Sequence, residues 1–411
     1  MESIIKDKQY YKFGLYGFFK NLRFFEHFLI LFFLEKGIDY VKIGFLYSIR
    51  EITIILLEIP SGLVADSIGR RKTMTGAFSL YIISFFTFYF SNNFVLMALA
   101  MLLFAFGDAF RSGVHKAMIF HYLKTTGQTD LKADYYGHTR SWSQTGSAIS
   151  SLVAALVVFY YGSYKIIFAA TVIPYLLDMI LVLSYPSYLD GEKKPLETDT
   201  LKKRFGFVFS TFVHSFKSAE LIKSLTNLSL YTGYYKAVKD YLQPVIMAFA
   251  LSVPFFAGLQ NKRKTALFIG LFYFFIYLLT AYVSRNSGKF EKRFKHPSRP
   301  MNITLMAGFL SGILLGVFYN FHLYLFAIAG FLVIMMIENL RKPIGIAYIA
   351  DRSDKHVMAS VLSAQSQAKS LFAAIIAPVA GFFADFYGPG TALMAISIFL
   401  LVFAPVYWLK K

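Results

Sequence analysis

The sequence predicts an all-α integral membrane protein with twelve transmembrane helices, and three observations lead to that fold class. Hydrophobic residues make up 56% of the 411-residue chain, charged residues make up only 16%, and the mean hydropathy is +0.53. A soluble domain carries roughly a quarter charged residues, so most of this chain's surface must face something other than water. Apolar stretches of about 20 residues recur, and each is long enough to cross a hydrocarbon core about 30 Å thick.

These stretches must be helical, because lipid offers no hydrogen-bond partner to a free backbone group. A β-barrel would show short segments of alternating hydrophobicity, whereas residues 267–282 and 393–408 form long continuous apolar runs. The twelve expected spans lie near residues 13–35, 42–64, 73–91, 94–122, 138–161, 165–186, 222–249, 264–284, 301–319, 321–349, 358–386 and 389–409.

The longest polar stretch, residues 186–223, divides the expected spans into six and six. We therefore expect two pseudo-symmetric six-helix bundles, at residues 1–187 and 222–411, joined by a cytoplasmic central loop at 188–221. Lys and Arg collect in cytoplasmic loops, and this rule places both termini in the cytoplasm. The richer set of alternate loops holds Arg70, Arg71, Lys72, Lys124, Lys132, the central loop, Arg285, Lys289, Lys292, Arg293, Lys295, Arg299, Arg352 and Lys355. The cluster of Lys262, Arg263 and Lys264 departs from the trend.

Several classes of function are disfavoured by composition and motifs. A net charge of +19 would indicate nucleic acid in a soluble protein, but basic cytoplasmic loops explain it here, so no nucleic-acid partner is expected. The chain has no cysteine, which excludes disulfides, thiolate metal sites and cysteine nucleophiles. It also lacks H-E-x-x-H, G-x-S-x-G and phosphate-loop motifs. We expect no enzyme, no metal and no cofactor, and the polar, basic residues 1–12 predict no cleaved signal peptide.

The loop after the second expected span reads GLVADSIGRRK at residues 62–72. Gly62 permits close helix packing, Asp66 can accept hydrogen bonds from an arginine or a helix N-terminus, and Gly69 allows a tight turn. Arg70 and Arg71 can anchor to carboxylates or lipid phosphates. The loop resembles the G-x-x-x-D-x-x-G-R-R/K signature of the major facilitator superfamily. The resemblance implies that these five residues form a cytoplasmic gate that locks the outward-facing state.

Two further segments support the resemblance. Residues 381–388, GFFADFYG, repeat G-x-x-A-D-x-x-G at the end of the eleventh span; under the family's inverted repeats, spans 2 and 11 are equivalent. This copy lacks the arginines and is expected at the outer face. Residues 107–113, GDAFRSG, resemble the family's fourth-span motif, which is linked to proton coupling. The fifth span, around residues 146–155, lacks the Gly-Pro cluster of drug/proton antiporters.

Charged residues inside the expected spans are the candidate site residues. A charge at a helix centre costs at least ~2.5–3.5 kcal/mol in lipid, so each needs a partner or an aqueous cavity. Asp108, Arg111 and His115 have the spacing of one helix face, and Lys20, Arg23 and His27 have the same spacing. The resemblance implies that spans 1, 4, 7 and 10 line a central cavity. The expected substrate contacts are Arg23, Glu26, Arg111, His115, Lys116, Tyr231, Tyr235, Lys236, Lys239 and Asn339, and the expected proton-coupling residues are Asp108, Glu26, Asp240 and Glu338.

Structural roles compete with these assignments. Arg50 and Glu51 are expected to make interhelical pairs, and Asp108 with Arg111 is either a static ion pair or part of the site. His115 could share the coupling proton near neutral pH. The tyrosines of the seventh span (Tyr231, Tyr234 and Tyr235) either pack or form hydrogen bonds in the cavity.

The resemblance implies a secondary active transporter that works by alternating access with a coupling ion, expected to be a proton. The excess of Lys and Arg over Asp and Glu in the expected cavity favours a small anionic solute. The alternative is a multidrug or amphipathic-compound efflux antiporter, since the chain contains 46 Phe and 28 Tyr, although aromatic residues also gather at bilayer interfaces. We expect a multi-pass monomer in the plasma (inner) membrane of a prokaryote, surrounded by lipid.

Overall fold

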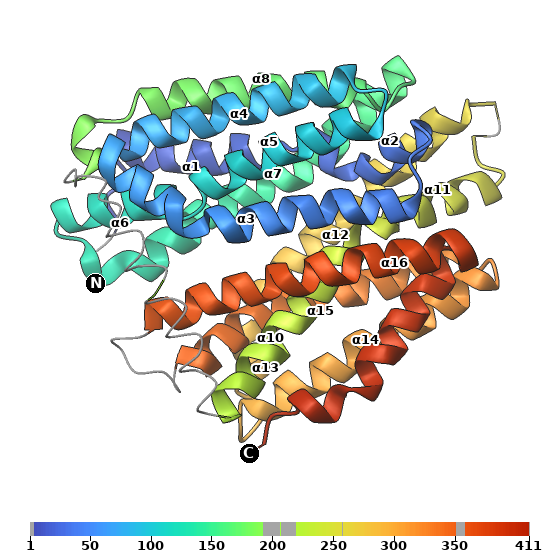
Figure 1. Ribbon diagram of the computed structural model, residues 1–411. Coiled ribbons are helices and arrows are strands. Elements are labelled where there is room, and N and C mark those ends of the chain that lie inside the picture. The colour runs from blue at the N-terminus through green and yellow to red at the C-terminus, as the bar shows by residue number, and fades with distance from the viewer. Residues whose placement is uncertain (1–3, 192–205, 207–218, 257, 351–357, 411) are drawn as a thin grey trace. The chain divides into compact units, whose positions relative to one another are not determined.

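The computed structural model describes residues 4–191, 206, 219–256, 258–350 and 358–410 (Figure 1). Within these ranges the regular elements are helices, and no strand occurs. The chain divides into two compact units, and two long helices contribute residues to both. Unit 1 comprises Met1–Phe28, Thr53–Lys203 and Ile269–Tyr277, and unit 2 comprises Leu29–Ile52, Arg204–Phe268 and Leu278–Lys411.

Each helix except α3 and α12 lies entirely within one of the two units. Unit 1 contains α1 (Lys8–Lys20), η1 (Phe24–His27), α4 (Arg70–Phe90), α5 (Phe94–Arg111), α6 (Val114–Thr125), η2 (Thr129–Leu131), α7 (Lys132–Tyr161), α8 (Ile166–Leu183) and η3 (Ser187–Asp190). Unit 2 contains α2 (Leu29–Glu35), α10 (Ala219–Val238), η4 (Lys239–Tyr241), α11 (Leu242–Ser252), α13 (Ser287–Glu291), α14 (Ser298–Asn320), α15 (Tyr324–Ala350), α16 (Met358–Val402) and η5 (Ala404–Tyr407). The helices α3 (Tyr40–Ile68) and α12 (Asn261–Arg285) contribute to both units.

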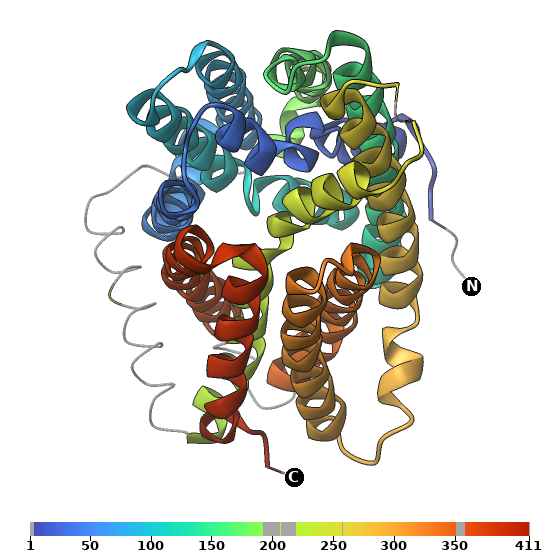
Figure 2. The same ribbon diagram turned by 90° about the vertical axis from the view of Figure 1, so that its right-hand side faces the viewer.

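The prediction of twelve helical segments is confirmed, because each expected span coincides with one helix or with consecutive helices. The last two spans form α16, which is interrupted at Gly388, where φ is +83° and ψ is 159°. The ribbon of α16 changes direction sharply within the element (Figures 1 and 2). The expected central loop, 188–221, falls largely outside the described residues, so the division into bundles at that loop stays a prediction.

Eight helices in the described part of the chain are long and apolar enough to cross a membrane, and one of them, Val361–Val402, covers two expected spans. The expected first span misses this standard because it is broken into short helices, whereas α10 of the seventh span is 20 residues long and misses it because Glu220, Lys223, Lys236 and several uncharged polar residues lie within it. The second span, α3, misses it because Arg50, Glu51 and Glu58 lie within it. Polar or charged residues and backbone breaks therefore account for these three spans.

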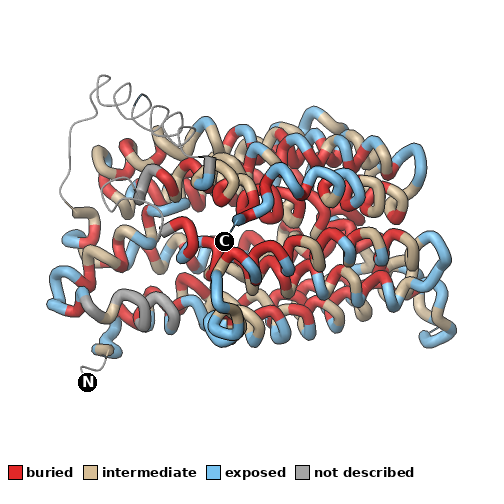
Figure 3. Tube along the Cα trace, turned by 90° about the horizontal axis from the view of Figure 1, so that it is seen from below, coloured by how far each residue is buried: buried red, intermediate tan, exposed pale blue. Residues whose placement is uncertain are grey.

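The exposed side chains of the long helices are themselves apolar. Leu56, Ile173, Ile180 and Phe399 are 59–62% exposed. Figure 3 shows buried and exposed positions alternating along the same helices. Large apolar side chains on the outside are destabilising in water but suit contact with lipid tails. The helices therefore have a protein-facing side and a lipid-facing side.

A fully buried arginine ties three helices of unit 2 together. Arg341 of α15 donates to the carbonyl oxygen of Met301, to Thr304 Oγ1 at 2.9 Å and to Asn227 Oδ1 at 2.6 Å. Its guanidinium also lies 4.8 Å from the ring centre of Tyr231. Oxygen acceptors on α10 and α14, together with an aromatic face, thus stabilise a buried cation.

We expect Arg341→Leu to lower the free energy of unfolding by about 3 kcal/mol, because several buried acceptors lose a charged donor. The measurement is the thermal unfolding midpoint of purified protein in detergent. Lys342→Ala, which removes an exposed charge from the adjacent position, is the matched control. A midpoint for Arg341→Leu equal to that of Lys342→Ala would contradict the interpretation.

Candidate functional site

Three of the expected spans are interrupted, and each interruption carries charged residues. The first span breaks after Lys20, and η1 begins at Phe24. The fourth breaks after Arg111, because Gly113 adopts a φ of +80° between α5 and α6. The seventh breaks at η4, Lys239–Tyr241. Irregular backbone at membrane depth is tolerated where it is buried or lines a cavity, and broken helices form solute and ion sites in transporters.

The breaks of the first and fourth spans meet in unit 1 around the carboxylate of Asp108. The Tyr81 hydroxyl donates to Asp108 Oδ1 at 2.5 Å and accepts from Arg111 Nε at 3.0 Å. The same Oδ1 lies 3.1 Å from Arg111 Nη2 and 3.5 Å from Arg23 Nη2. Arg23 also lies 3.9 Å from Glu26. We call these five residues the Asp108 cluster. The side chains of Asp108, Arg23 and Arg111 are 16–18% exposed, so they are partly accessible.

His115 and Lys116 follow the break and have different surroundings. The His115 ring stacks on Tyr16, with ring centres 3.6 Å apart, and His115 Nε2 lies 3.3 Å from the Tyr185 hydroxyl. Lys116 is exposed, and its Nζ lies 5.3 Å from the ring centre of Phe120. The structure therefore places His115 inside unit 1, half-buried among aromatic rings, and Lys116 at its surface.

The prediction that Asp108, Arg111 and His115 lie on one face of a single helix was wrong. Asp108 and Arg111 lie on α5, but His115 lies on α6, because the positive φ of Gly113 ends the first helix. Likewise, His27 lies in η1 rather than on the helix of Lys20, and its ring lies 5.1 Å from that of Tyr273 on α12.

In unit 2, Glu51 of α3 is almost fully buried between two cations. Its Oε1 accepts from Arg50 Nε and Nη2 at 3.2 and 3.1 Å, and its Oε2 pairs with Nζ of Lys236 on α10. Lys236 Nζ also lies 3.3 Å from Ser370 Oγ on α16. Lys236, an expected substrate contact, thus links three helices in this conformation. The expected interhelical pairing of Glu51 is present.

Asp240 is buried at the break of the seventh span. Lys239 Nζ donates to its Oδ1 at 2.7 Å, and the Tyr47 hydroxyl of α3 donates to its Oδ2 at 3.0 Å. Tyr47 is also 5.1 Å from the Arg50 guanidinium, measured from the ring centre. Both oxygens of the carboxylate are therefore engaged, one of them by a cation.

The remaining expected residues lie on α10 and α15. Tyr231 is fully buried, and its hydroxyl donates to the Ile334 carbonyl at 3.2 Å, so its contacts are those of a packing residue. Tyr235 is half-buried. The Thr232 hydroxyl lies 3.1 Å from both oxygens of buried Glu338. Asn339 donates to the carbonyl of Met335, one turn before it, at 2.9 Å.

The signature segment is largely helical. The helix α3 continues to Ile68, and the turn is a single residue, Gly69, with φ +101°. Arg71 donates from its backbone N and its Nε to Asp190 at 2.8 and 3.1 Å, and Arg70 Nη1 reaches the Ala117 carbonyl at 3.4 Å. The carboxylate anchor of Arg71 is therefore Asp190.

Among the described residues, no atom lies within 4 Å of where a Cβ on Gly62 would stand, so the expected close packing at Gly62 stays a prediction. Asp66 lies one turn before the turn residue Gly69, on the last turns of α3. Nothing in the contacts of Gly62, Asp66, Gly69, Arg70 and Arg71 tests the expected gating role, which stays a prediction.

The second copy of the motif makes a contact between distant segments of unit 2. Asp385 accepts from the backbone N of Tyr40 at 2.9 Å and of Val41 at 2.8 Å. These are the first N–H groups of α3, so the carboxylate caps that helix and complements its dipole. Gly381 packs against the same turn, because a Cβ there would lie 2.8 Å from Val41 Cα.

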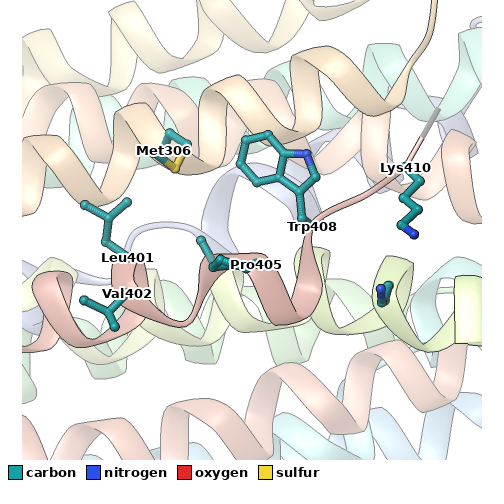
Figure 4. A pocket seen from close by; sticks show the side chains of 8 residues that line it. Met306, Leu401, Val402, Pro405, Trp408 and Lys410 are labelled. Atoms are coloured by element: carbon teal, nitrogen blue, oxygen red, sulfur yellow. The ribbon is translucent and has the colours of Figure 1, made fainter.

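Two small grooves lie away from these clusters. One, of about 400 Å³, is lined on unit 2 by residues that include Met306, Leu401, Trp408, Lys223 and Lys410 (Figure 4). The other, of about 360 Å³, is lined on unit 1 by residues that include Arg70, His121 and Lys124. Neither contains a residue of the Asp108 cluster. Among the described residues, no group of three His, Cys, Asp or Glu side chains is placed to hold a metal.

Sequence reasoning missed the uncharged partners and one acid. Tyr81, Tyr47 and Ser370 complete the clusters, and Asp190 anchors Arg71. The two tyrosines and the serine could not be identified from the sequence, because these residue types are common in apolar spans. Asp190 could have been considered, since it is an acid beside Gly191 at the end of the sixth span.

We expect Glu51→Gln to lower the free energy of unfolding by about 3 kcal/mol, because it leaves Arg50 and Lys236 without their shared buried carboxylate. The double variant Glu51→Gln/Lys236→Met keeps the net charge of the wild-type cluster and should recover part of the loss. Thermal unfolding of Glu51→Gln, Lys236→Met and the double variant in detergent measures this. A double variant destabilised by the sum of the two single effects would show that the residues do not interact.

Comparison with known proteins places the chain among transporters. The family model of the Major Facilitator Superfamily matches residues 24–376. An uncharacterized MFS-type transporter, YxaM, from Bacillus subtilis strain 168 is 31% identical over 84 residues, which span 20% of this chain and 21% of that protein.

Solved structures show the same fold at low sequence identity. The nucleoside transporter NupG is 13% identical, with a TM-score of 0.76 and coverage of 98% of each chain. The peptide transporter POT in complex with sulfate is 14% identical, with a TM-score of 0.70 and coverage of 99% of this chain and 96% of that one. A family match over most of the chain, an all-helical fold and the expected spans agree. The chain belongs to the major facilitator superfamily and is a multi-pass membrane transporter of that type.

Proposed function

We propose that the chain is a secondary active transporter that carries a small anionic solute by alternating access, coupled to protons. The observation that carries the proposal is the Asp108 cluster. It brings together Arg23 and Arg111 at the breaks of two helices, partly exposed, with one carboxylate oxygen shared between them. Guanidinium groups bind carboxylates and phosphates in a fork geometry, so a second anion can occupy the outer side of these arginines.

Basic side chains outnumber acidic ones around the cluster. Lys20, Arg23 and Arg111 are basic, Asp108 and Glu26 are acidic, and Lys20 interacts electrostatically with the other four. A small anion would give these basic groups the additional partner that they need at membrane depth.

Proton coupling needs an acid that changes its charge during the cycle. The expected carriers were Asp108, Glu26, Asp240 and Glu338. The first three lie beside cations in this conformation, whereas Glu338 accepts from the Thr232 hydroxyl. An acid that pairs with a cation in one state and is protonated in another would link proton movement to the change of state.

Alternating access requires contacts that close one end of the transport pathway in one state and that break in the other state. The start of α3 is such a contact, because Asp385 of α16 caps it and the Ser48 hydroxyl donates to the Ala374 carbonyl at 2.5 Å. Gly44 fits closely against Ala377 and Pro378. These contacts join a segment of the first sequence half to a helix of the second half, within unit 2. We propose that they close the outer end.

Orientation and location complete the proposal. Basic loops place both termini in the cytoplasm, so the turn at Gly69 lies at the inner face and the turn at Gly388 at the outer face. We place the protein, as a monomer, in the plasma (inner) membrane of a bacterium, in agreement with its relative from Bacillus subtilis.

Arg111→Met tests the anion site. A thermal-shift screen with carboxylates, phosphate esters, sulfate and lipophilic cations selects a solute, and flux into proteoliposomes is then measured with and without a pH gradient. We expect the variant to lose at least about tenfold in anion flux, since a charge-assisted hydrogen bond contributes about 1.5–3 kcal/mol.

Lys289→Ala, which removes an exposed charge on α13, should keep wild-type flux. Unchanged flux of every transported anion in Arg111→Met would refute the anion site. Transport of lipophilic cations alone would favour the multidrug efflux alternative.

Asp385→Ala tests the outer contact. The chain has no cysteine, so spin labels on Phe45→Cys and Phe386→Cys can report the separation of α3 and α16 by pulsed electron resonance. Loss of a helix cap costs about 1 kcal/mol, so we expect the population with the short distance to fall about fivefold relative to the separated one.

Asp39→Ala is the matched control, because Asp39 also caps α3, through Lys42 N at 2.8 Å, but does so from within the same segment. Equal distance distributions in Asp385→Ala and Asp39→Ala would show that the cap does not hold the two helices together.

A further inference from the structure

Asp178 of α8 is a buried acid outside all the clusters described above. Thr171, Tyr175, Asp178 and Val182 are spaced by three or four residues and are all buried, so they form the protein-facing side of this helix. The Asp178 side chain belongs to a residue with 0% exposure. It therefore faces the interior of unit 1 rather than lipid or water.

Both carboxyl oxygens of Asp178 are buried without a hydrogen-bond partner among the described residues. Four other acids inside the two units differ in this respect: Asp108 and Asp240 accept from a cation and a tyrosine, Glu51 accepts from two cations, and Glu338 accepts from a hydroxyl. A buried carboxylate with no donor is strongly unfavourable, whereas a neutral carboxylic acid is tolerated. Asp178 thus has the surroundings of a protonated acid.

The charged and titratable groups around Asp178 come from several elements. Lys20 and Tyr16 of α1, Arg111 at the end of α5, and Tyr185 after α8 interact with it electrostatically. From α4, Tyr81 packs on Tyr175, one turn before Asp178. Arg23, which precedes η1, and Glu26 of η1 belong to the Asp108 cluster. Among the described residues of α7, no charged group interacts with the carboxyl.

Neither cation near Asp178 is bound to it. Arg111 is held by Asp108 and Tyr81, and Lys20, at the end of α1, is half-buried. Lys20 lies at the break of the first span, as the last residue of α1. A movement of α1 against α8 that brings the Lys20 side chain to Asp178 would give the carboxylate the partner that it lacks in this conformation.

We infer that Asp178 is the proton-binding residue of the transporter, an inference that rests on the proposed proton coupling. In the conformation described, Asp178 holds the proton as a neutral carboxylic acid. On the change of state, the O–H bond breaks, the proton leaves to water, and the carboxylate formed pairs with Lys20. Lys20 thereby moves away from the Asp108 cluster, so proton release weakens the hold on a bound anion.

Infrared difference spectroscopy of the purified protein, exchanged between H2O and D2O, tests this with the proton itself as the probe. Wild-type protein should show the carbonyl stretch of a protonated carboxylic acid, shifted by deuterium. Asp178→Asn should lose part of this band, because buried Glu338, which accepts from a hydroxyl, can contribute the rest. Asp190→Asn, the same chemical change at an acid held by Arg71, should keep the whole band. A wild-type spectrum without the band, or a band of unchanged intensity in Asp178→Asn, overturns the inference.

Transport assays distinguish the role of Asp178 from proton coupling itself. With the anion selected by the thermal-shift screen, Asp178→Asn should keep exchange across proteoliposomes but lose at least tenfold of the accumulation driven by a pH gradient. Asp178→Glu should restore part of that accumulation, which a merely structural role would not predict. Accumulation that persists in Asp178→Asn refutes the role of Asp178. Wild-type protein that exchanges the anion but ignores the pH gradient instead refutes proton coupling, and with it the transport role of this acid.

Discussion

The free energy needed to place charge at membrane depth constrains this molecule more than any other single factor. It explains why the embedded charges occur in groups: Glu51 lies between Arg50 and Lys236, and Asp108 lies between Arg23 and Arg111. Breaking such a group exposes an uncompensated charge, so each one fixes the helices that contribute to it. The clusters therefore serve as connections between helices as well as candidate binding groups.

The same constraint accounts for where the helices break. A broken helix leaves backbone N–H and C=O groups without partners, and lipid cannot supply any. The breaks after Lys20 and Arg111 and at η4 lie where polar side chains are already gathered. Backbone irregularity and side-chain charge are thus placed together, in protein-lined surroundings.

Hydropathy and one motif were sufficient to predict the fold, and the reason is physical. A 20-residue apolar run in a chain with 16% charged residues has few alternatives to a membrane helix, and the turn at Gly69 is visible because only glycine readily adopts a positive φ. The helix interruptions were less visible. Gly113 lies between Ser112 and Val114, and nothing in that spacing distinguishes a break from a glycine inside a helix.

The contacts within the site were harder still to predict, because they join residues that are far apart in the chain. Asp240 and Tyr47 are 193 positions apart, and Arg71 and Asp190 are 119 apart. A single sequence carries no information about such pairs. Asp178 illustrates the limit: its presence in an apolar span was evident, but its lack of a partner, which makes it chemically distinctive, is a property of the folded chain alone.

The two copies of the glycine motif show how one local structure can serve two different contacts. Gly69 and Gly388 adopt similar backbone angles, +101° and 145° against +83° and 159°. The residues that follow differ: Arg71 after the first turn binds Asp190 within unit 1, whereas Pro389 after the second carries no charge. In the second copy the acid makes the long-range contact, since Asp385 caps α3. The glycines thus determine the turn, and the flanking charges determine what each turn holds.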